Sequence, residues 1–325
     1  MEILDTNTVL VKVKTINIDS VVQDNQENLR PDSFDSFIGQ EHIKKILQTA
    51  INSAKKRKGS MGHILFCGPS GFGKTTMAHI IAKQSGVNMK VVTGYAINKP
   101  AEIVSILNSL EEGDILFIDE IHRLKPNVEE VLYIAMEDFV IDMVMPEGGS
   151  VRIPLNKFTL IGATTKGEGL SKPIKNRFVY DFHFMDYNAE EKKIIIDIYL
   201  KKYGVPTNKN VIEKIHNKVD SVPREIHNLC IKIRDFFVTE GKNEKEFTQD
   251  LRKRFLIHSK IDDGGMSPIH QKYLNILKRN DRPMGIKSIA IQLGMNEKAV
   301  EEDIEPLLIK LGKIEKTIGG RILVS

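Results

Sequence analysis

The sequence predicts an α/β fold with a parallel β-sheet, followed by a small helical domain and by a C-terminal domain of short helices and one hairpin. Three observations predict it. Short runs of consecutive apolar residues alternate with helical patterns over the first half of the chain, as in a parallel sheet covered on both faces. A glycine-rich loop follows the first of these runs. Beyond about residue 184 only helical patterns continue, until a Gly-Gly turn near the C-terminus.

The first domain is expected to begin with an amphipathic helix within residues 39–58, because apolar residues recur there at helical spacing. Its apolar face consists of Ile43, Ile46, Leu47, Ala50, Ile51 and Ala54. Four apolar runs are expected to form buried strands of the sheet. They are residues 63–67, 90–93, 114–118 and 158–162.

Changes in pattern divide the 325 residues into four parts. A polar extension covers residues 1–28, the large domain 29–183, the helical domain 184–262 and the C-terminal domain 263–325. In the helical domain, helices are expected at residues 190–202, 209–218 and 223–238. In the last part, Ser267 and Pro268 suit the cap and first turn of a helix, and residues 318–321 suit a hairpin turn.

Composition excludes several classes of protein. With 47 basic and 43 acidic residues the net charge is +4, so a DNA-binding surface would have to be a local patch. The two cysteines, Cys67 and Cys230, lie far apart and indicate neither a disulfide framework nor a zinc site. The sequence has no signal-peptide pattern and no apolar stretch long enough to span a bilayer. It therefore predicts a cytoplasmic protein that does not act in a membrane.

The glycine-rich loop is a phosphate-binding motif. Gly68-Pro-Ser-Gly-Phe-Gly-Lys-Thr75 lies between a predicted strand and a predicted helix, which is the context the motif requires. Glycines at 68, 71 and 73 let backbone N–H groups surround the phosphates of ATP or ADP at the positive end of the helix dipole. Lys74 would neutralise phosphate charge, and the hydroxyl of Thr75 would complete the coordination of Mg²⁺. The alternative is a glycine-rich turn without a ligand.

A pair of acids follows a later apolar strand. Asp119 is expected at the carboxyl end of that strand, beside the phosphate loop, where its carboxylate would hold Mg²⁺. The next residue, Glu120, would polarise the attacking water. An acidic pair in this position is otherwise a common helix start, but its pairing with the phosphate loop favours ATP hydrolysis.

Three further polar residues are candidates from their positions. Thr165 follows the strand expected at 158–162, at the sheet edge where ligands bind, and would hydrogen-bond the γ-phosphate or the water. An ordinary strand-end threonine is the alternative. Arg177 and Arg224 suit phosphate contacts, although a single arginine is more often a solvated surface charge.

Several motifs together resemble the RuvB family of AAA+ ATPases, and the resemblance runs from about Leu29 to Ser325. The most specific of them are the runs DEIHRL, EEVLY and AMEDF. The motifs are Leu29-Arg-Pro31, Phe37-Ile-Gly-Gln40, Gly68 to Thr76, Leu116 to Leu124, Glu129 to Tyr133, Ala135 to Phe139 and Phe158 to Thr165.

The resemblance implies an ATP-driven motor that moves Holliday junctions in recombination and repair. It implies an AAA+ P-loop domain, a small helical domain and a winged-helix domain, assembled as a homohexameric ring around duplex DNA. RuvA would be the partner that holds the junction, with the RuvC resolvase as a further partner. Lys74, Asp119 and Glu120 keep the roles given above, and Thr165 becomes the sensor of the γ-phosphate. A final group would complete the nucleotide site: the arginine finger Arg177, the second sensor Arg224, the adenine neighbours Arg30, Ile38 and Gly39, and the loop residue Thr76.

The segment 139–155 resembles the family's β-hairpin that docks on RuvA. It alternates like two strands around a Gly-Gly turn at Glu147-Gly-Gly149. Its residues Val140, Ile141, Met143, Val144 and Met145 are apolar for an exposed hairpin. A hairpin folded onto its own domain is the alternative.

The sequence also departs from the family's pattern. Lys166 and Lys175 stand where the family usually has arginine, and Ser221-Val-Pro-Arg224 replaces Gly-Thr-Pro-Arg. Because lysine cannot form a bidentate clamp on phosphate, no nucleotide contact is assigned to these two lysines.

The C-terminal domain suggests backbone contacts to DNA. Acids cluster on its expected recognition helix, at Glu301, Glu302, Asp303 and Glu305, where they would repel phosphates and disfavour base recognition. The basic residues Lys313, Lys316 and Arg321 lie on or beside the wing and would bind DNA without reading its sequence. Use of the winged helix for protein contacts only is the alternative.

Two rival functions share the same motifs. A clamp-loader subunit has the same ATPase fold, but the apolar hairpin and the winged helix disfavour it. An ATP-gated regulator that binds DNA is disfavoured by the intact Asp119–Glu120 pair and by Arg177.

Overall fold

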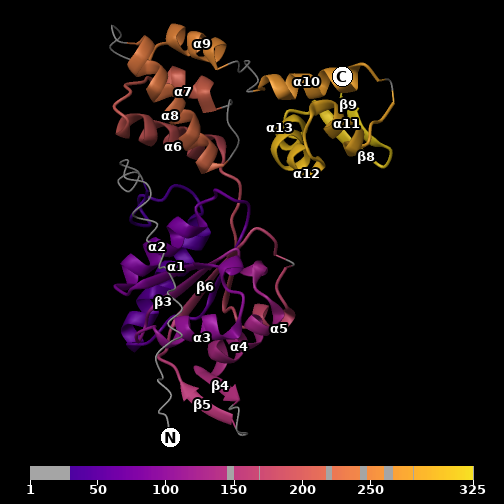
Figure 1. Cartoon of the computed structure of the whole chain (residues 1–325). Coiled ribbons are helices and arrows are strands. Elements are labelled where there is room, and N and C mark those ends of the chain that lie inside the picture. The colour runs from indigo at the N-terminus through magenta and orange to yellow at the C-terminus, as the bar shows by residue number, and fades with distance from the viewer. Residues whose placement is uncertain are drawn as a thin grey trace, which may run out of the picture. The chain divides into compact units, whose positions relative to one another are not determined.

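The computed structural model confirms the α/β class and the order of domains (Figure 1). It describes residues 30–144, 150–167, 169–216, 222–241, 247–259, 266–280 and 282–324. The predicted extension at 1–28, the hairpin tip Glu147–Gly149, Met145, Ser221 and the domain boundary near 262 lie outside the described residues.

The large domain is built on one parallel sheet of five strands in the order β2-β3-β6-β1-β7. Each of the four predicted strands is present, with its ends shifted by at most two residues. A fifth, β7, was not predicted. The strands are β1 (Ile64–Cys67), β2 (Met89–Thr93), β3 (Ile115–Asp119), β6 (Thr159–Thr164) and β7 (Tyr180–His183).

Helices cover both faces of this sheet, which explains why its central strands are apolar at consecutive positions. On one face α1 (Glu41–Arg57) and α2 (Lys74–Ser85) pack on the side chains of Phe66 and Phe117. On the other, α3 (Pro100–Asn108) and α4 (Pro126–Asp138) pack on those of Leu65 and Leu116. In α1 five of the six predicted core residues are buried, but Ile46 is 44% exposed, so its assignment to the core was wrong.

The predicted hairpin forms directly after α4. Phe139 ends the helix with a left-handed backbone (φ 52°) and leads into β4 (Val140–Val144), which pairs antiparallel with β5 (Ser150–Pro154). Figure 1 shows the two strands extending from the end of α4, away from the five-stranded sheet. Their pairing is that of a separate two-stranded ribbon, and Ile141 contributes to the core beside α4.

In the part of the helical domain that the structure describes, the three predicted helices are present together with one more. They are α6 (Ala189–Lys202), α7 (Lys209–Ile215), α8 (Pro223–Glu240) and the unpredicted α9 (Gln249–His258). Asn188 caps α6 by accepting a hydrogen bond from the backbone of Glu191, and Thr248 caps α9 in the same way from Leu251. Such caps satisfy backbone donors that a helix leaves unpaired at its start.

The C-terminal domain is the predicted arrangement of helices and a wing. Ser267 is the N-cap of α10 (Pro268–Lys278), which packs with α11 (Ile286–Leu293). The next helix is continuous but changes its winding. It runs through α12 (Glu297–Ala299), a π-helical turn (Val300–Ile304) and α13 (Glu305–Lys310). The wing pairs β8 (Ile314–Thr317) with β9 (Gly320–Leu323).

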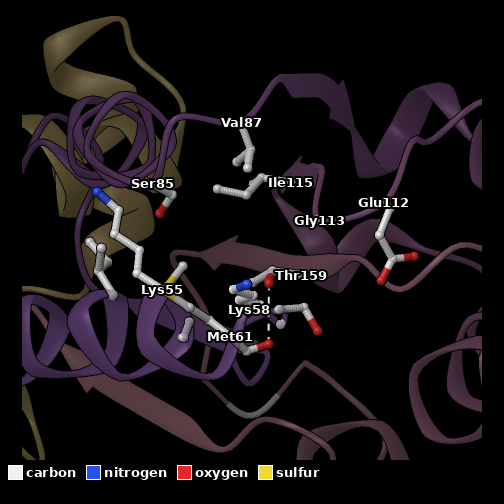
Figure 2. A pocket seen from close by; sticks show the side chains of 13 residues that line it. Lys55, Lys58, Met61, Ser85, Val87, Glu112, Gly113, Ile115 and Thr159 are labelled. Carbon is white, nitrogen blue, oxygen red and sulfur yellow. Dashed lines mark hydrogen bonds between the residues drawn. The ribbon is translucent and has the colours of Figure 1, made fainter.

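A pocket of about 230 Å³ opens at the amino-terminal ends of β3 and β6, beneath the ends of α1 and α2. Figure 2 shows Lys55, Ser85 and Glu112 around it, and the hydrogen bond from Thr159 to the backbone of Met61. No predicted site residue lines this pocket. Among the described residues, no helix combines the length and the apolar character that a membrane crossing requires.

Candidate nucleotide and DNA sites

The predicted nucleotide residues come together at the carboxyl edge of the sheet. The phosphate loop follows β1, Asp119 ends β3, and Thr165 follows β6, which lies between those two strands. Because all five strands are parallel, their carboxyl ends meet at one edge. The sheet order therefore explains why residues so far apart in sequence share one site.

The phosphate loop has the backbone that its glycines predict. Gly68, Gly71 and Gly73 all have positive φ, at 146°, 84° and 94°. Space is also restricted: a Cβ at Gly73 would lie 2.9 Å from Cζ of Phe37, and one at Gly71 would lie 2.8 Å from Cγ1 of Val222. A side chain at either position would meet both strain and a clash. Thr75 and Thr76 follow in the first turn of α2.

Lys74 is directed into the phosphate loop. Its Nζ donates hydrogen bonds to the carbonyl oxygens of Gly68 and Pro69, each at 2.8 Å, and the residue is only 7% exposed. Burial lowers the pKa of Lys74 because it penalises the charged form, while the nearby carboxylates of Asp119 and Glu120 act in the opposite direction. An anionic phosphate in the loop would compensate the buried ammonium group.

Asp119 and Glu120 have different environments. Burial raises the pKa of Asp119, whose carboxylate accepts a hydrogen bond from the backbone N–H of Glu120 at 3.0 Å. Glu120 itself has a left-handed backbone (φ 50°), which is uncommon for a residue with a side chain. Its carbonyl oxygen lies so close to Gly94 that a Cβ there would be 2.4 Å away. The turn that orients Glu120 thus depends on a glycine in the neighbouring loop after β2.

One oxygen of Glu120, Oε2, has two side-chain neighbours. Thr165 donates to it at 3.3 Å, and Nδ1 of His122 lies 3.2 Å away. Burial lowers the pKa of His122, so the imidazole is neutral near pH 7. Since a carboxylate only accepts hydrogen bonds, we assign the imidazole proton to Nδ1. Sequence reasoning missed His122, although it is part of the DEIHRL motif.

The two consecutive threonines at the end of β6, Thr164 and Thr165, differ in exposure. Thr165 is exposed at the site, whereas Thr164 is fully buried and bonded to its own loop and to Nδ1 of His122, 2.9 Å away. The Thr164 hydroxyl donates to the carbonyl of Lys166 at 3.0 Å and accepts from the backbone N–H of Lys166 at 2.9 Å. Thr164 therefore shapes the loop, and Thr165 is the one available to a ligand.

Two of the predicted adenine neighbours, Ile38 and Gly39, lie in a loop that packs on the segment after β7. A Cβ at Gly39 would lie 2.9 Å from Cε1 of Tyr187, and the Tyr187 hydroxyl donates to the carbonyl of Phe72 at 3.2 Å. Gln40 bonds the backbone of Met185 in both directions, at 2.7 and 3.1 Å. These contacts connect the loop at 37–40 with the phosphate loop. Ile38 is partly buried in this loop, and Arg30 is exposed.

The two predicted arginines have different partners. Arg224 lies in the first turn of α8 and donates to the hydroxyl of Ser70 in the phosphate loop at 3.2 Å. Arg177 follows α5 (Lys172–Lys175) and instead contacts α4 of its own domain. It donates to the hydroxyl of Tyr133 at 2.7 Å and forms an ion pair with Glu137. Only Arg224 contacts the phosphate loop within the chain.

The three predicted DNA-binding residues do not share one environment. Lys313 is exposed, and Lys316 is half exposed while its Nζ lies 2.7 Å from Oε2 of Glu305. Arg321 is only 13% exposed at its side chain, and its guanidinium binds Glu305 and Glu301. The expectation that Arg321 offers its charge at the wing surface is therefore corrected. Its charge is already compensated by acids on the recognition helix.

Glu305 was expected to repel DNA from the surface of that helix, which is wrong because the residue is fully buried. Burial alone would raise the pKa of Glu305, but hydrogen bonds from Arg321, Lys316 and Tyr273 outweigh it and lower the pKa below its ordinary value. The Tyr273 hydroxyl donates at 2.9 Å and Nε of Arg321 at 2.8 Å. Glu305 thus joins α10, α13 and the wing in one buried polar network.

Two family models match the chain. Residues 29–184 match the Holliday junction DNA helicase RuvB P-loop domain, and residues 263–325 match the RuvB C-terminal winged helix domain. The chain is 41% identical over 317 residues to the Holliday junction branch migration complex subunit RuvB of Campylobacter fetus, covering 97% of this chain and 91% of the relative. The subunit of the same name from Aliarcobacter butzleri is 40% identical over 318 residues, covering 96% and 91%.

Solved structures agree with these matches. The Thermotoga maritima RuvB Holliday junction branch migration motor superimposes with a TM-score of 0.76 at 36% identity. The match covers 91% of this chain and 96% of that one. The likeness therefore extends over all the domains and is not confined to the ATPase core.

Proposed function

The chain belongs to the RuvB family of Holliday junction DNA helicases, and from that premise we propose that it is the ATP-hydrolysing motor of branch migration. One observation of the structure supports this most directly. Glu120, the residue suited to activate water, is held by Thr165 and His122 at the sheet edge where the phosphate loop also lies. A protein that only binds nucleotide does not need an oriented carboxylate at this position.

The residues of the site would have different roles in ATP hydrolysis. Lys74 and the backbone N–H groups after Gly68, Gly71 and Gly73 would bind the phosphates of ATP. Glu120 would accept a proton from the attacking water, and Thr165 would orient that water or the γ-phosphate. The donor set also fits Mg²⁺, since Thr75 offers a hydroxyl and Asp119 a half-buried carboxylate with one backbone partner. When bound there, Mg²⁺ would neutralise phosphate charge.

The arginines support a ring of identical subunits. Arg177 faces α4 of its own chain and does not contact the phosphate loop. We propose that it completes the ATP site of a neighbouring subunit, in a homohexamer around duplex DNA. Arg224 would contact phosphate from within the chain, and Arg30, Ile38 and Gly39 would border the adenine.

The hairpin and the winged helix supply the partners in this proposal. The ribbon of β4 and β5 would dock on RuvA, and Lys313 and Lys316 would contact the DNA backbone. From the sequence we also propose a contact with the RuvC resolvase and a cytoplasmic location. The four-part division of the chain at residues 28, 183 and 262 is retained as a proposal.

The test is branch migration of a synthetic four-way junction with ATP, with and without RuvA. We expect strand exchange that requires ATP and RuvA, and that stops in Glu120→Gln, a variant which should still bind ATP. A steady ATPase rate stimulated by circular duplex DNA would accompany it. Exchange that continues without hydrolysis, or a single slow turnover that DNA does not stimulate, would instead support an ATP-gated regulator and overturn the motor.

A further inference from the structure

A second cluster of chemically capable side chains lies beside the phosphate loop and takes no part in the proposed hydrolysis. It consists of Cys67, Asp181 and His183, whose sulfur, oxygen and nitrogen donor atoms all lie within 4.8 Å of one another. We propose that this cluster is a binding site for a thiophilic divalent cation, with Zn²⁺ as the reference ion. The inference does not depend on the proposed function, since it concerns residues outside the hydrolytic set.

The sheet itself brings the three residues together. Cys67 ends β1 and lies opposite His183 of β7, while Leu65 lies opposite Asp181. Side chains of alternate residues in a strand share a face of the sheet. Cys67, Asp181 and His183 therefore share one face at neighbouring positions. The sequence alone indicates no zinc site here, because the ligands come from two strands and Cys67 is not part of a paired-cysteine motif.

The distances are close to those that a cation would impose. Oδ1 of Asp181 lies 3.6 Å from Sγ of Cys67 and 3.8 Å from Nε2 of His183. Zinc bonds of about 2.3 Å to sulfur and about 2.0–2.2 Å to nitrogen and oxygen, at tetrahedral angles, place donor atoms about 3.3–3.6 Å apart. The side between Asp181 and His183 must contract by a few tenths of an ångström. The side between Cys67 and His183, which is at most 4.8 Å, must contract by up to about 1.3 Å. The largest movement falls to His183, whose side chain is 66% exposed and has room to rotate.

The burial of the three residues fits a site that is open on one side. Cys67 is 2% exposed and forms the floor, while Asp181 and His183 are exposed and form the mouth. Three protein ligands leave a fourth position for water, as in zinc sites that are not closed. The donor set also selects among cations, because thiolate and imidazole favour Zn²⁺ over Mg²⁺, which prefers oxygen ligands.

Binding has a definite proton balance. Without a cation, the Cys67 thiol donates to Asp181. When the cation binds, the sulfur–hydrogen bond is replaced by a sulfur–metal bond and one proton leaves to solvent. The cluster changes from a net charge of −1, carried by Asp181, to zero. The second carboxylate oxygen of Asp181 lies 4.0 Å from Nζ of Lys175, so this lysine opposes binding by charge repulsion.

The position of the site gives it a consequence for the ATPase. Cys67 immediately precedes Gly68 of the phosphate loop, and a Cβ at Gly167 would lie 4.0 Å from its Sγ. A bound cation would therefore join the end of β1 to the edge strand β7, between the phosphate loop and the loop after β6. We expect it to stabilise this part of the domain, because a ligand that binds only the folded state shifts unfolding by mass action.

The experiment is a Co²⁺ titration of the full-length, nucleotide-free protein, followed by displacement with Zn²⁺. Thiolate coordination gives a sulfur-to-cobalt charge-transfer band, which oxygen ligands at the Mg²⁺ site cannot produce. We expect the band in the wild type and in Cys230→Ser, which removes the other buried cysteine. We expect its loss in Cys67→Ser and at least a tenfold weaker affinity in the surface variant His183→Ala.

Lys175→Met provides a gain-of-binding arm. Removal of its charge should strengthen Co²⁺ binding severalfold, and a purely structural role of the cluster would not produce that change. A missing charge-transfer band in the folded wild type would overturn the proposal. So would a band that persists in Cys67→Ser, or an affinity that His183→Ala leaves unchanged.

Discussion

The guanidinium of Arg177 lies over the ring of Tyr133, with its central carbon 4.8 Å from the ring centre, in addition to the hydrogen bond between the two side chains. Tyr133 and Glu137, the second partner of Arg177, are four residues apart on α4 and so lie on one face of that helix. The same helix ends at Asp138, where the hairpin begins. The proposed arginine finger and the proposed docking hairpin are therefore carried by a single helix.

Arg177→Ala should retain ATP binding and lose hydrolysis, with the defect in the neighbouring subunit. An arginine finger supplied in trans contributes on the order of 10³-fold or more to the rate. Mixing this variant with Lys74→Ala protein should restore part of the activity, because some interfaces then combine an intact site with an intact finger. ATPase rates across mixing ratios provide the measurement. Mixed rings that form and show no rescue would contradict action in trans.

Glu137→Gln should raise the unstimulated ATPase rate by no more than about fivefold, because Arg177 must leave its own chain to reach a neighbour. The effect is small because both side chains are partly exposed, at 31% and 41%, and solvent screens an exposed ion pair. Glu130→Gln, an exposed acid on the same helix, is the control and should change nothing. A rate that falls in Glu137→Gln would mean that the contact orients the finger for catalysis instead of restraining it.

Aspartates at Met143 and Val144 should spare basal ATPase and abolish stimulation by RuvA. Both residues lie in β4, in the ribbon that leaves the main sheet. A charge placed in an apolar contact surface must lose its hydration when a partner binds. Pull-down and ATPase assays with RuvA test the expectation. Unchanged RuvA binding would indicate that the ribbon contacts only its own domain.

Replacing Lys313 by alanine should weaken binding equally for unrelated duplexes and reduce the salt dependence by about one counterion. Lys316 and Arg321 are left out of the test because Glu305 and Glu301 already bind their charges. Lys298→Ala on the acidic helix, where it lies 3.8 Å from Glu302, is the matched control. Binding titrations at several salt concentrations measure the slope. A slope unchanged by Lys313→Ala would remove this lysine from the DNA interface.

The winged helix should lose stability in acid because of Glu305. The folded-state pKa of Glu305 is lowered, so its ionised network stabilises the domain fully above the ordinary pKa of 4.5 and progressively less as the pH falls below it. Removing one partner of such a buried pair costs about 3–5 kcal/mol. Glu305→Gln should therefore unfold more easily at pH 7 and show a flatter pH dependence below 4.5. Thermal unfolding from pH 3 to pH 7 tests this, and parallel curves for the two proteins would refute it.

Sequence patterns predicted the central strands and the phosphate loop because those features depend on local spacing. They missed β7 (Tyr180–His183), which lies at the edge of the sheet. Phe182 is the one buried residue of this strand, so β7 shows no continuous apolar run. They also misplaced Glu305 and Arg321, which are 16 residues apart and meet only through the packing of the wing. His122 was missed for a related reason. Its role depends on a hydrogen bond to Thr164, 42 residues away, and on its contact with Glu120.

The π-helical turn at Val300–Ile304 has a consequence for how the recognition helix divides its acids. A π turn contains one residue more than an α-helical turn, and one residue corresponds to about 100° of rotation around the helix axis. The extra residue shifts the helical phase between Glu301 and Glu305. Glu301 stays at the surface while Glu305 enters the core, and Arg321 reaches both. The one extra residue in this turn thus determines that Glu305 is buried in the domain and that Glu301 remains exposed to solvent.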